Sequence, residues 1–267
     1  MIRDITIGQY YPADSVIHRL DPRVKLVGTL TFLISLFLFN NLIGYVVAGL
    51  FLATVIKLSK VPFSFIVRGL KTIMVLMLFT VVFNLFLTDG TVLWQWKFIK
   101  ITIEGIQTAI FMALRLTFLI IGSSLMTLTT TPNQLTDGLE TGLAPLKKLH
   151  VPVHEISMMM SIALRFIPIL LEETDKIMKA QIARGADFES GNIIKKAKSL
   201  VPLLVPLFIS AFRRANDLAT AMEARCYRGG DFRTKMKPLI YQKRDRWAYA
   251  VCWCYLVMCI IIGRILF

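Results

Sequence analysis

Long apolar stretches separated by short polar segments fill the first half of the chain, and one more lies at its end. Each stretch carries at most one charged residue, and the five are residues 24–39, 42–58, 70–88, 106–128 and 247–262. A helix that crosses a membrane needs about 17 to 25 predominantly apolar residues. The pattern therefore predicts an all-α membrane protein with about five transmembrane helices.

The first two stretches are short, and only Asn40 and Asn41 separate them. One long tilted helix over residues 24–58 is the alternative to two crossings. It would place the next basic cluster across the membrane from the basic N-terminal segment, against the positive-inside rule. Two helices are therefore predicted, and the cytoplasmic side is expected to hold the cluster Lys57, Lys60, Arg68 and Lys71.

Residues 129–246 contain two units of similar plan, residues 156–184 and residues 200–225. Each unit begins with an apolar run and continues as a segment of mixed polarity that favours a helix. Helices of that length measure roughly 40 to 45 Å. The apolar runs are too short to cross the membrane, and crossing would carry a lysine-rich connection outside. Both helices are predicted on the cytoplasmic side, kinked or started by their prolines, which are Pro168, Pro202 and Pro206.

Three smaller features are also predicted. Residues 91–104 alternate between apolar and polar like a small hairpin. Residues 132–145 resemble a short amphipathic helix bounded by prolines. His18 and Asp21 are expected to shape the entry to the first helix rather than to perform chemistry.

Composition supports the membrane class, since 55% of the residues are hydrophobic and the mean hydropathy is +0.63. The net charge of +14 would suggest nucleic acid as the partner of a soluble protein, but in a membrane protein basic residues first report topology. With the N-terminus inside, all but four of the 31 Lys and Arg residues are cytoplasmic, the exceptions being Lys97, Lys100, Arg115 and Arg264. No nucleic-acid partner is expected, and the C-terminus is predicted outside.

Known catalytic patterns are missing from the sequence. It contains no Gly-x-x-x-x-Gly-Lys phosphate loop, no Gly-x-Ser-x-Gly and no His-Glu-x-x-His. His150 and His154 have helical spacing, but Pro152 lies between them and no nearby cysteine completes a metal site. We expect no metal site and no enzymatic activity in this chain.

Two arginines lie in apolar surroundings. Arg115 falls within the fourth stretch, where a charge is costly, and a structural hydrogen-bonding role is predicted for it. Arg165 precedes Pro168 and is expected to bond a carbonyl that the proline leaves without a donor. A self-contained secondary transporter or channel, the alternative function, needs ionisable groups in several membrane helices, and only Arg115 is available.

A short motif recurs at the ends of the two long helices, in "AQIARGADF" and "AMEARCYRGGDF". Taken singly, each arginine is explained as a helix-end cation beside a terminator. Taken together, they present two guanidinium groups beside small residues, and a guanidinium suits an acidic or carbonyl-lined groove. The pair therefore indicates a soluble protein partner in two related copies, bound through Ala183, Arg184, Gly185, Ala224, Arg225 and Cys226.

At this point the chain resembles the T component of energy-coupling factor transporters, the membrane scaffold of bacterial vitamin and metal uptake systems related to ABC transporters. The resemblance covers essentially the whole chain and rests on "SVIHRLDPRVKL", "ALRL", "TLTTTP", "ALRFIP" and the two Ala-Arg motifs. One departure is Cys226, where the family most often has glycine, which leaves open where that helix ends.

The resemblance implies a non-catalytic subunit of the bacterial plasma membrane, with domains over residues 1–128 (four crossings), 129–243 (a cytoplasmic bundle of long coupling helices) and 244–267 (the last crossing). Each Ala-Arg motif would enter a groove of one of two related ATPase subunits, which bind the ATP and Mg, while this chain binds no cofactor. A separate membrane-embedded substrate-binding subunit, the S component, would recognise the substrate and contact Met158, Met159, Met160, Leu203, Leu204 and Phe208.

Overall fold

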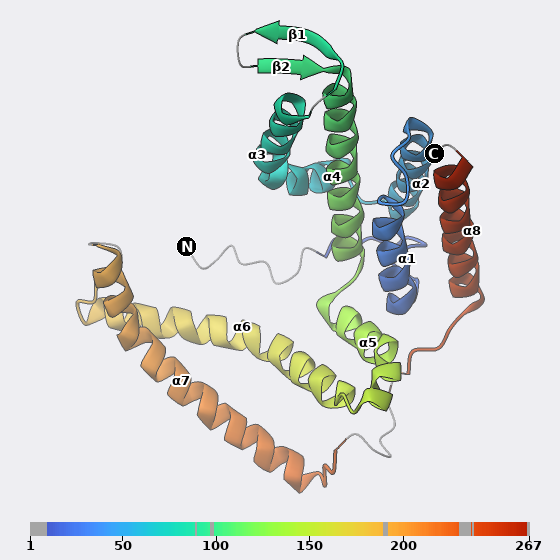
Figure 1. The fold of residues 1–267 in the computed structure, drawn as a ribbon. Coiled ribbons are helices and arrows are strands. Elements are labelled where there is room, and N and C mark those ends of the chain that lie inside the picture. Colours follow the sequence, from blue (N-terminus) through green and yellow to red (C-terminus); the bar gives the residue numbers. More distant parts are fainter. Residues whose placement is uncertain are drawn as a thin grey trace. The chain divides into compact units, whose positions relative to one another are not determined.

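The computed structural model describes residues 10–88, 90–96, 99–188, 192–229, 236 and 238–265. These residues form helices for the most part, which confirms an all-α membrane protein (Figure 1). The elements are α1 (Pro22–Ser35), α2 (Leu42–Ser59), α3 (Phe63–Leu87), β1 (Val92–Trp96), β2 (Ile99–Thr102), α4 (Ile103–Thr129), α5 (Pro132–Gly142), the 3-10 helix η1 (Ala144–Leu149), α6 (Val153–Ala183), α7 (Ile193–Ala224) and α8 (Lys243–Ile265).

Contacts divide the chain into two compact units. The core unit holds residues 8–141 and 239–267, and the long-helix unit holds residues 142–238. α1 to α5 and α8 therefore belong to the first, and α6 and α7 to the second. The domain boundaries predicted after residues 128 and 243 divide the chain by location, in the membrane or in the cytoplasm. Units defined by contacts do not test that division, so it stays a prediction.

The predicted separation of the first two helices is confirmed. α1 ends at Ser35, and a tight turn follows in which Phe37 and Leu38 donate their amides to the carbonyls of Ile34 and Ser35. The chain then passes through Asn40 and Asn41 before α2 begins. α1 is thus shorter than the predicted 24–39, because the last apolar residues form this turn.

Four helices of the described chain are long and apolar enough to cross a membrane: α2, α4, α6 and α8. Three of them coincide with predicted crossings, whereas α6 was expected outside the membrane. α6 is long enough to cross because the helix continues through Pro168 and joins the apolar run to part of the polar segment that follows. The predicted crossing at 70–88 lies in α3, whose described apolar stretch is Ile73–Phe86.

The predicted hairpin is confirmed as two antiparallel strands, β1 and β2, with Trp96 opposite Ile99. α4 follows directly, and its first turn is capped by the Thr102 hydroxyl, which accepts a hydrogen bond from the Gly105 amide at 3.0 Å. α3 packs along α4.

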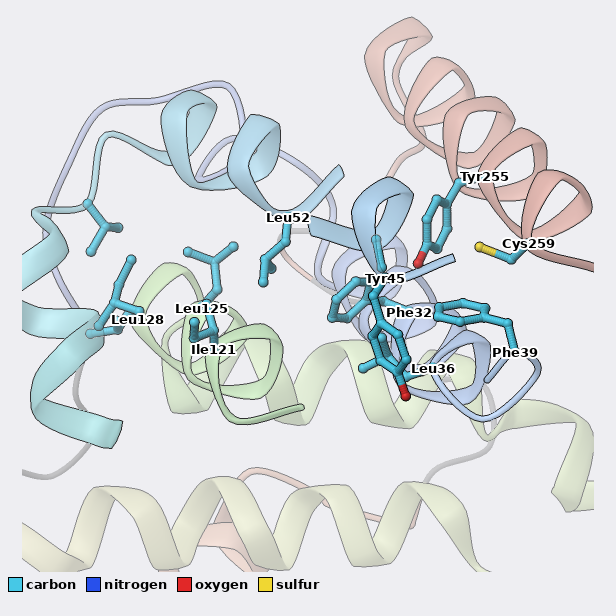
Figure 2. Close-up of a cluster of buried hydrophobic side chains, with 13 residues drawn as sticks. Phe32, Leu36, Phe39, Tyr45, Leu52, Ile121, Leu125, Leu128, Tyr255 and Cys259 are labelled. Carbon is cyan, nitrogen blue, oxygen red and sulfur yellow. The ribbon is translucent and has the colours of Figure 1, made fainter. Parts of the chain in front are cut away.

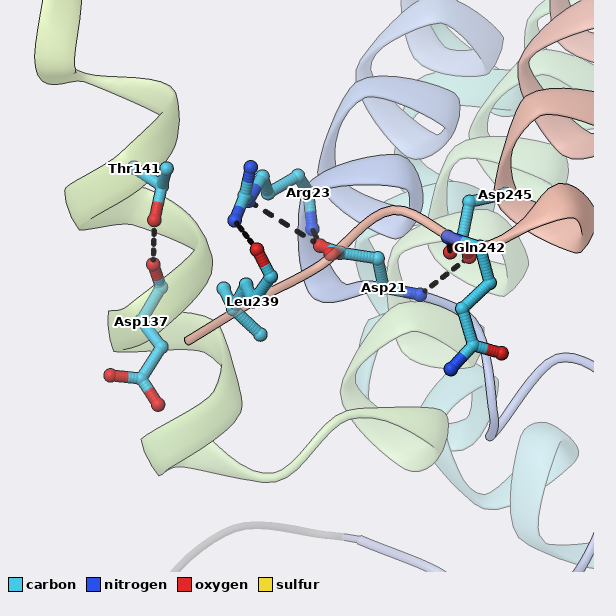
Figure 3. A network of polar contacts seen from close by, with 7 residues as sticks. All are labelled: Asp21, Arg23, Asp137, Thr141, Leu239, Gln242 and Asp245. Carbon is cyan, nitrogen blue, oxygen red and sulfur yellow. Dashed lines mark hydrogen bonds and ion pairs between the residues drawn. The ribbon is translucent and has the colours of Figure 1, made fainter. Parts of the chain in front are cut away.

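The carboxylate of Asp245 ties the start of α8 to the start of α1, which the carboxylate of Asp21 caps (Figure 3). The Asp21 side chain caps α1 by accepting from the Arg23 amide at 2.9 Å. Asp245 is buried and accepts from the amides of Asp21 at 3.0 Å and Gln242 at 2.7 Å. Arg23 donates to the Leu239 carbonyl at 2.9 Å. The predicted role of Asp21 at the helix entry is confirmed.

An aromatic-rich cluster fills the middle of the core unit (Figure 2). Tyr255 of α8 stacks on Phe51 of α2 with ring centroids 4.2 Å apart, and its hydroxyl lies 2.9 Å from the Ser35 hydroxyl of α1. The buried members are Phe32, Leu36, Phe39, Tyr45, Ala48, Leu52, Val61, Ile66, Ile121, Leu125, Leu128, Tyr255 and Cys259. Helices from both ends of the chain therefore share one hydrophobic core.

Gly263 in α8 should tolerate no side chain. A Cβ there would lie 2.5 Å from the Leu38 carbonyl oxygen, and a backbone atom cannot rotate away as a side chain can. We expect Gly263→Ala to destabilise the protein by about 1 to 3 kcal/mol, measured by thermal unfolding in detergent. Gly142→Ala is the matched control, because a Cβ there meets nothing within 4 Å. Equal stability of the two variants would contradict the close approach.

Candidate functional site

α6 and α7 form an antiparallel pair, held by contacts between their side chains (Figure 1). The Glu173 carboxylate of α6 accepts hydrogen bonds from the Arg214 guanidinium at 2.8 and 3.2 Å and from the Ser210 hydroxyl. Further along α6, the side-chain amide of Gln181 donates to the Pro202 carbonyl of α7 at 3.3 Å. The residue numbers rise along one helix as they fall along the other, so α7 returns along α6.

The prolines lie inside these helices and neither begin nor end them. Pro206 has no amide hydrogen, which leaves the Pro202 carbonyl without its helical donor. Gln181 supplies that donor, a role that the sequence analysis missed. Arg165 is exposed and bonds none of the described residues, so its predicted bond to a carbonyl freed by Pro168 is not seen, and its structural role stays a prediction.

The end of α6 is a Schellman motif, in which a left-handed residue closes the last turn. Arg184 is the C-cap residue, and Gly185 follows with φ at 88°. The Gly185 amide donates to the Ile182 carbonyl and the Ala186 amide to the Gln181 carbonyl, both at 2.9 Å. The Ala-Arg-Gly sequence thus places the arginine at the last position of the helix.

The end of α7 repeats this geometry with a cysteine. Arg225 is the C-cap residue, and Cys226 takes the left-handed conformation with φ at 57°. Its amide donates to the Glu223 carbonyl at 2.8 Å, and the Tyr227 amide donates to the Met222 carbonyl at 3.1 Å. Cysteine at the position where the resemblance predicts glycine therefore does not move the end of the helix.

Both arginine tips are accessible. Arg184 and Arg225 are exposed, as are Ala183 and Ala224 beside them. Across the described ranges, neither guanidinium forms a hydrogen bond or an ion pair. We call these ends, residues 183–185 and 224–226, the two arginine tips.

The tips are related by an approximate two-fold arrangement. Arg214 follows Glu173 by 41 residues, and the same interval separates Arg184 from Arg225. The ion pair therefore joins equivalent positions of two similar helices. In an antiparallel pair the tips then extend in opposite directions, roughly 16 Å each from the ion pair and roughly 33 Å apart along the helices at 1.5 Å per residue.

An apolar stripe runs along α7 at helical spacing. All its members are exposed, and they are Val201, Leu204, Val205, Phe208, Ile209 and Phe212. Two residues predicted to contact a membrane partner, Leu204 and Phe208, belong to it. Leu203 is only 8% exposed and lies off this surface.

The predicted methionines lie near the start of α6. Met159 is 61% exposed and Met160 is 41% exposed, whereas Met158 is partly buried. Their contact with a membrane partner stays a prediction.

Arg115 of α4 donates to the side-chain oxygen of Asn40 and lies over the Phe37 ring, 5.3 Å from its centroid. This is the kind of structural hydrogen bond predicted for it. In the part of the chain that the structure describes, no group of three or more His, Cys, Asp or Glu side chains could hold a metal ion.

Cys226→Gly should strengthen the end of α7, because the left-handed conformation costs a non-glycine residue about 1 to 2 kcal/mol. We expect slower hydrogen exchange at the amides of residues 226 and 227, measured by mass spectrometry. Cys254→Gly, inside α8, should instead speed hydrogen exchange at the amides around residue 254, because glycine destabilises a helix interior. Faster exchange in Cys226→Gly would contradict the cap geometry.

Comparison with known proteins agrees with this architecture. The family model described as cobalt transport protein, CbiQ, matches residues 13–237. An energy-coupling factor transporter transmembrane protein EcfT from Clostridium kluyveri is 59% identical, over 99% of this chain and 98% of its own length. EcfT proteins of the same description from Bacillus subtilis and Lactococcus lactis are 51% and 48% identical, covering 92% and 91% of this chain and 93% and 92% of their own lengths. The chain therefore belongs to the CbiQ family and is a transmembrane component of an energy-coupling factor transporter.

Proposed function

We propose that this chain is the non-catalytic scaffold that couples ATP hydrolysis by two bound ATPase subunits to reorientation of a membrane-embedded S component during vitamin or metal uptake. The observation that carries the proposal is the pair of arginine tips, which have the same cap, the same exposure and an approximate two-fold relation. The ATP and Mg would be bound by the ATPases.

The chemistry of the tips supports a protein partner. A guanidinium donates in a planar fork and remains charged, so it suits a groove lined by carboxylates or carbonyls. The exposed alanine before each arginine leaves the approach open. Removing such a charge from a desolvated contact costs about 2 to 5 kcal/mol.

The two-fold relation supports two related partners rather than one. A symmetric pair of proteins presents the same groove twice, and a scaffold that fits it needs two equivalent contacts at a matching separation. Glu173 and Arg214 lie at the centre of such a pair. A heterodimer of similar ATPases would receive Arg184 in one subunit and Arg225 in the other.

The apolar stripe of α7 supports a second, membrane-embedded partner. Its six side chains present a continuous apolar surface, which matches a transmembrane helix better than a soluble protein surface. The exposed Met159 and Met160 add a deformable surface, which suits partners of varied shape. The S component is the occupant that we propose.

Coupling requires that the helices move as a pair when the tips are displaced. The Glu173–Arg214 ion pair and the Gln181–Pro202 hydrogen bond join α6 to α7 at two levels. ATP-driven closure of the ATPases would then change the angle of both helices and turn the S component toward the cytosol. The alternative function, a self-contained transporter or channel, would need Arg115 as an ionisable group of a transport path, whereas Arg115 donates a hydrogen bond to the Asn40 side chain.

Replacing both tip arginines should release the ATPases. We expect Arg184→Ala with Arg225→Ala to weaken their binding at least about 30-fold while membrane insertion is unchanged, measured by co-purification and by quantitative binding. The matched control is Arg165→Ala with Arg213→Ala, which removes one exposed arginine from each long helix away from the tips. Retention of both ATPases by the tip variant would refute the docking role.

We further propose that the N-terminus and both tips lie in the cytosol and the C-terminus outside the cell. Cys226 is exposed and reports on the second tip once Cys252, Cys254 and Cys259 are replaced, and Ala186→Cys reports on the first. Both thiols should react with a membrane-impermeant maleimide in inside-out vesicles and stay unlabelled in intact cells. Labelling on opposite faces would mean that α7, the helix between the two tips, crosses the membrane. Labelling of both thiols in intact cells would mean that α6 crosses, as its apolar character would permit.

A further inference from the structure

A cavity of about 540 Å³ lies within the core unit, among α1, α2, α4 and α8. Its lining is almost wholly apolar and comes from most of α1 up to Phe32, the second half of α2, the end of α4 and the start of α8. Phe32 is the lining residue farthest along α1 and stacks against Phe51, and Val16, Ile17 and Leu20 line the cavity from the segment before α1. Three of these helices, α2, α4 and α8, are long and apolar enough to cross a membrane, which would place the cavity among lipid-facing helices.

A buried cation lines this cavity, and Asp21 attracts it only from beyond ion-pair distance. Lys25 is 7% exposed, and its ammonium group donates to the carbonyls of Thr129 at 2.8 Å and His18 at 3.1 Å. An ammonium has three N–H donors, so one remains. No carboxylate among the residues described lies within 4.0 Å of it. A buried charge of this kind is costly unless an opposite charge balances it.

A second cation lies at the same end. Arg244 lines the cavity from the first turn of α8, and the Asp21–Asp245 hydrogen bond holds that turn beside the start of α1, which carries Lys25. Trp247 also lines the cavity and is exposed, and tryptophan is typical of the boundary between lipid tails and headgroups. The cavity thus has a cationic end and an apolar end, with about 10 Å of α1 between Lys25 and Phe32.

We propose that this cavity binds an anionic phospholipid, with its phosphate at Lys25 and Arg244 and an acyl chain between α1, α2, α4 and α8. The charge selects an anion, and the apolar walls select a molecule with a hydrocarbon tail. A free phosphate would leave most of the volume unfilled. The proposal goes beyond the coupling role and does not depend on the arginine tips.

The test uses the delipidated full-length protein in neutral detergent, titrated with phosphatidylglycerol or phosphatidylcholine carrying brominated acyl chains. Bromine quenches the fluorescence of Trp247 on contact, and Trp247→Phe identifies its share of the signal. We expect phosphatidylglycerol to bind about tenfold more tightly than phosphatidylcholine, and Arg244→Gln to remove most of that difference. Equal affinity for the two lipids would overturn the proposal.

Two matched pairs separate the cavity from general surface effects. Arg246→Gln removes an exposed cation from the same turn of α8 outside the cavity and should leave the preference unchanged. Ala248→Phe should fill the cavity and weaken binding, whereas Ala250→Phe, outside it, should not. Loss of the preference in Arg246→Gln to the same extent as in Arg244→Gln would also overturn the proposal.

Discussion

The long-helix unit depends on the ion pair between Glu173 and Arg214. The Glu173 carboxylate binds both Arg214 and Ser210, and together with the Gln181–Pro202 hydrogen bond this holds the two helices in one register. Because that register joins equivalent positions of two similar helices, it determines where the two arginines lie relative to each other. Slippage by one helical turn would change the separation of the two tips by about 5 Å, so that they would no longer match two contacts at a fixed spacing.

The two tips show how one backbone geometry is reached with different residues. Glycine adopts the left-handed conformation freely, and Gly185 is the expected residue after a C-cap arginine. The left-handed conformation costs Cys226 more conformational energy than it costs a glycine. Cys226 still adopts it because the two main-chain hydrogen bonds of the cap and the small size of the side chain outweigh that cost. The position is therefore defined by its backbone angles more than by its residue type.

Sequence reasoning found the parts that depend on local pattern, namely the helices, the hairpin at β1 and β2, and the recurring Ala-Arg ends. It missed what depends on register between helices. Glu173 and Arg214 were not singled out, although their interval equals that of the tips, and Gln181 has no local signal as the donor to a carbonyl freed by Pro206. Leu203 was grouped with its exposed neighbours because an apolar run does not reveal which side of the helix is covered. The buried ammonium of Lys25 is likewise invisible in sequence, since a basic residue beside an apolar stretch is normally expected in water.

The core unit is discontinuous in sequence, and this determines when it can be completed during synthesis. Asp245 bonds the start of α1 and Tyr255 stacks on Phe51, and both belong to α8, which the ribosome makes after α6 and α7. The aromatic cluster therefore stays uncovered on the side that α8 packs against until α6, α7 and α8 have all been synthesised. Release of the nascent chain before α8 is made would leave this apolar surface uncovered, and membrane quality-control proteases would encounter it before any partner subunit had assembled.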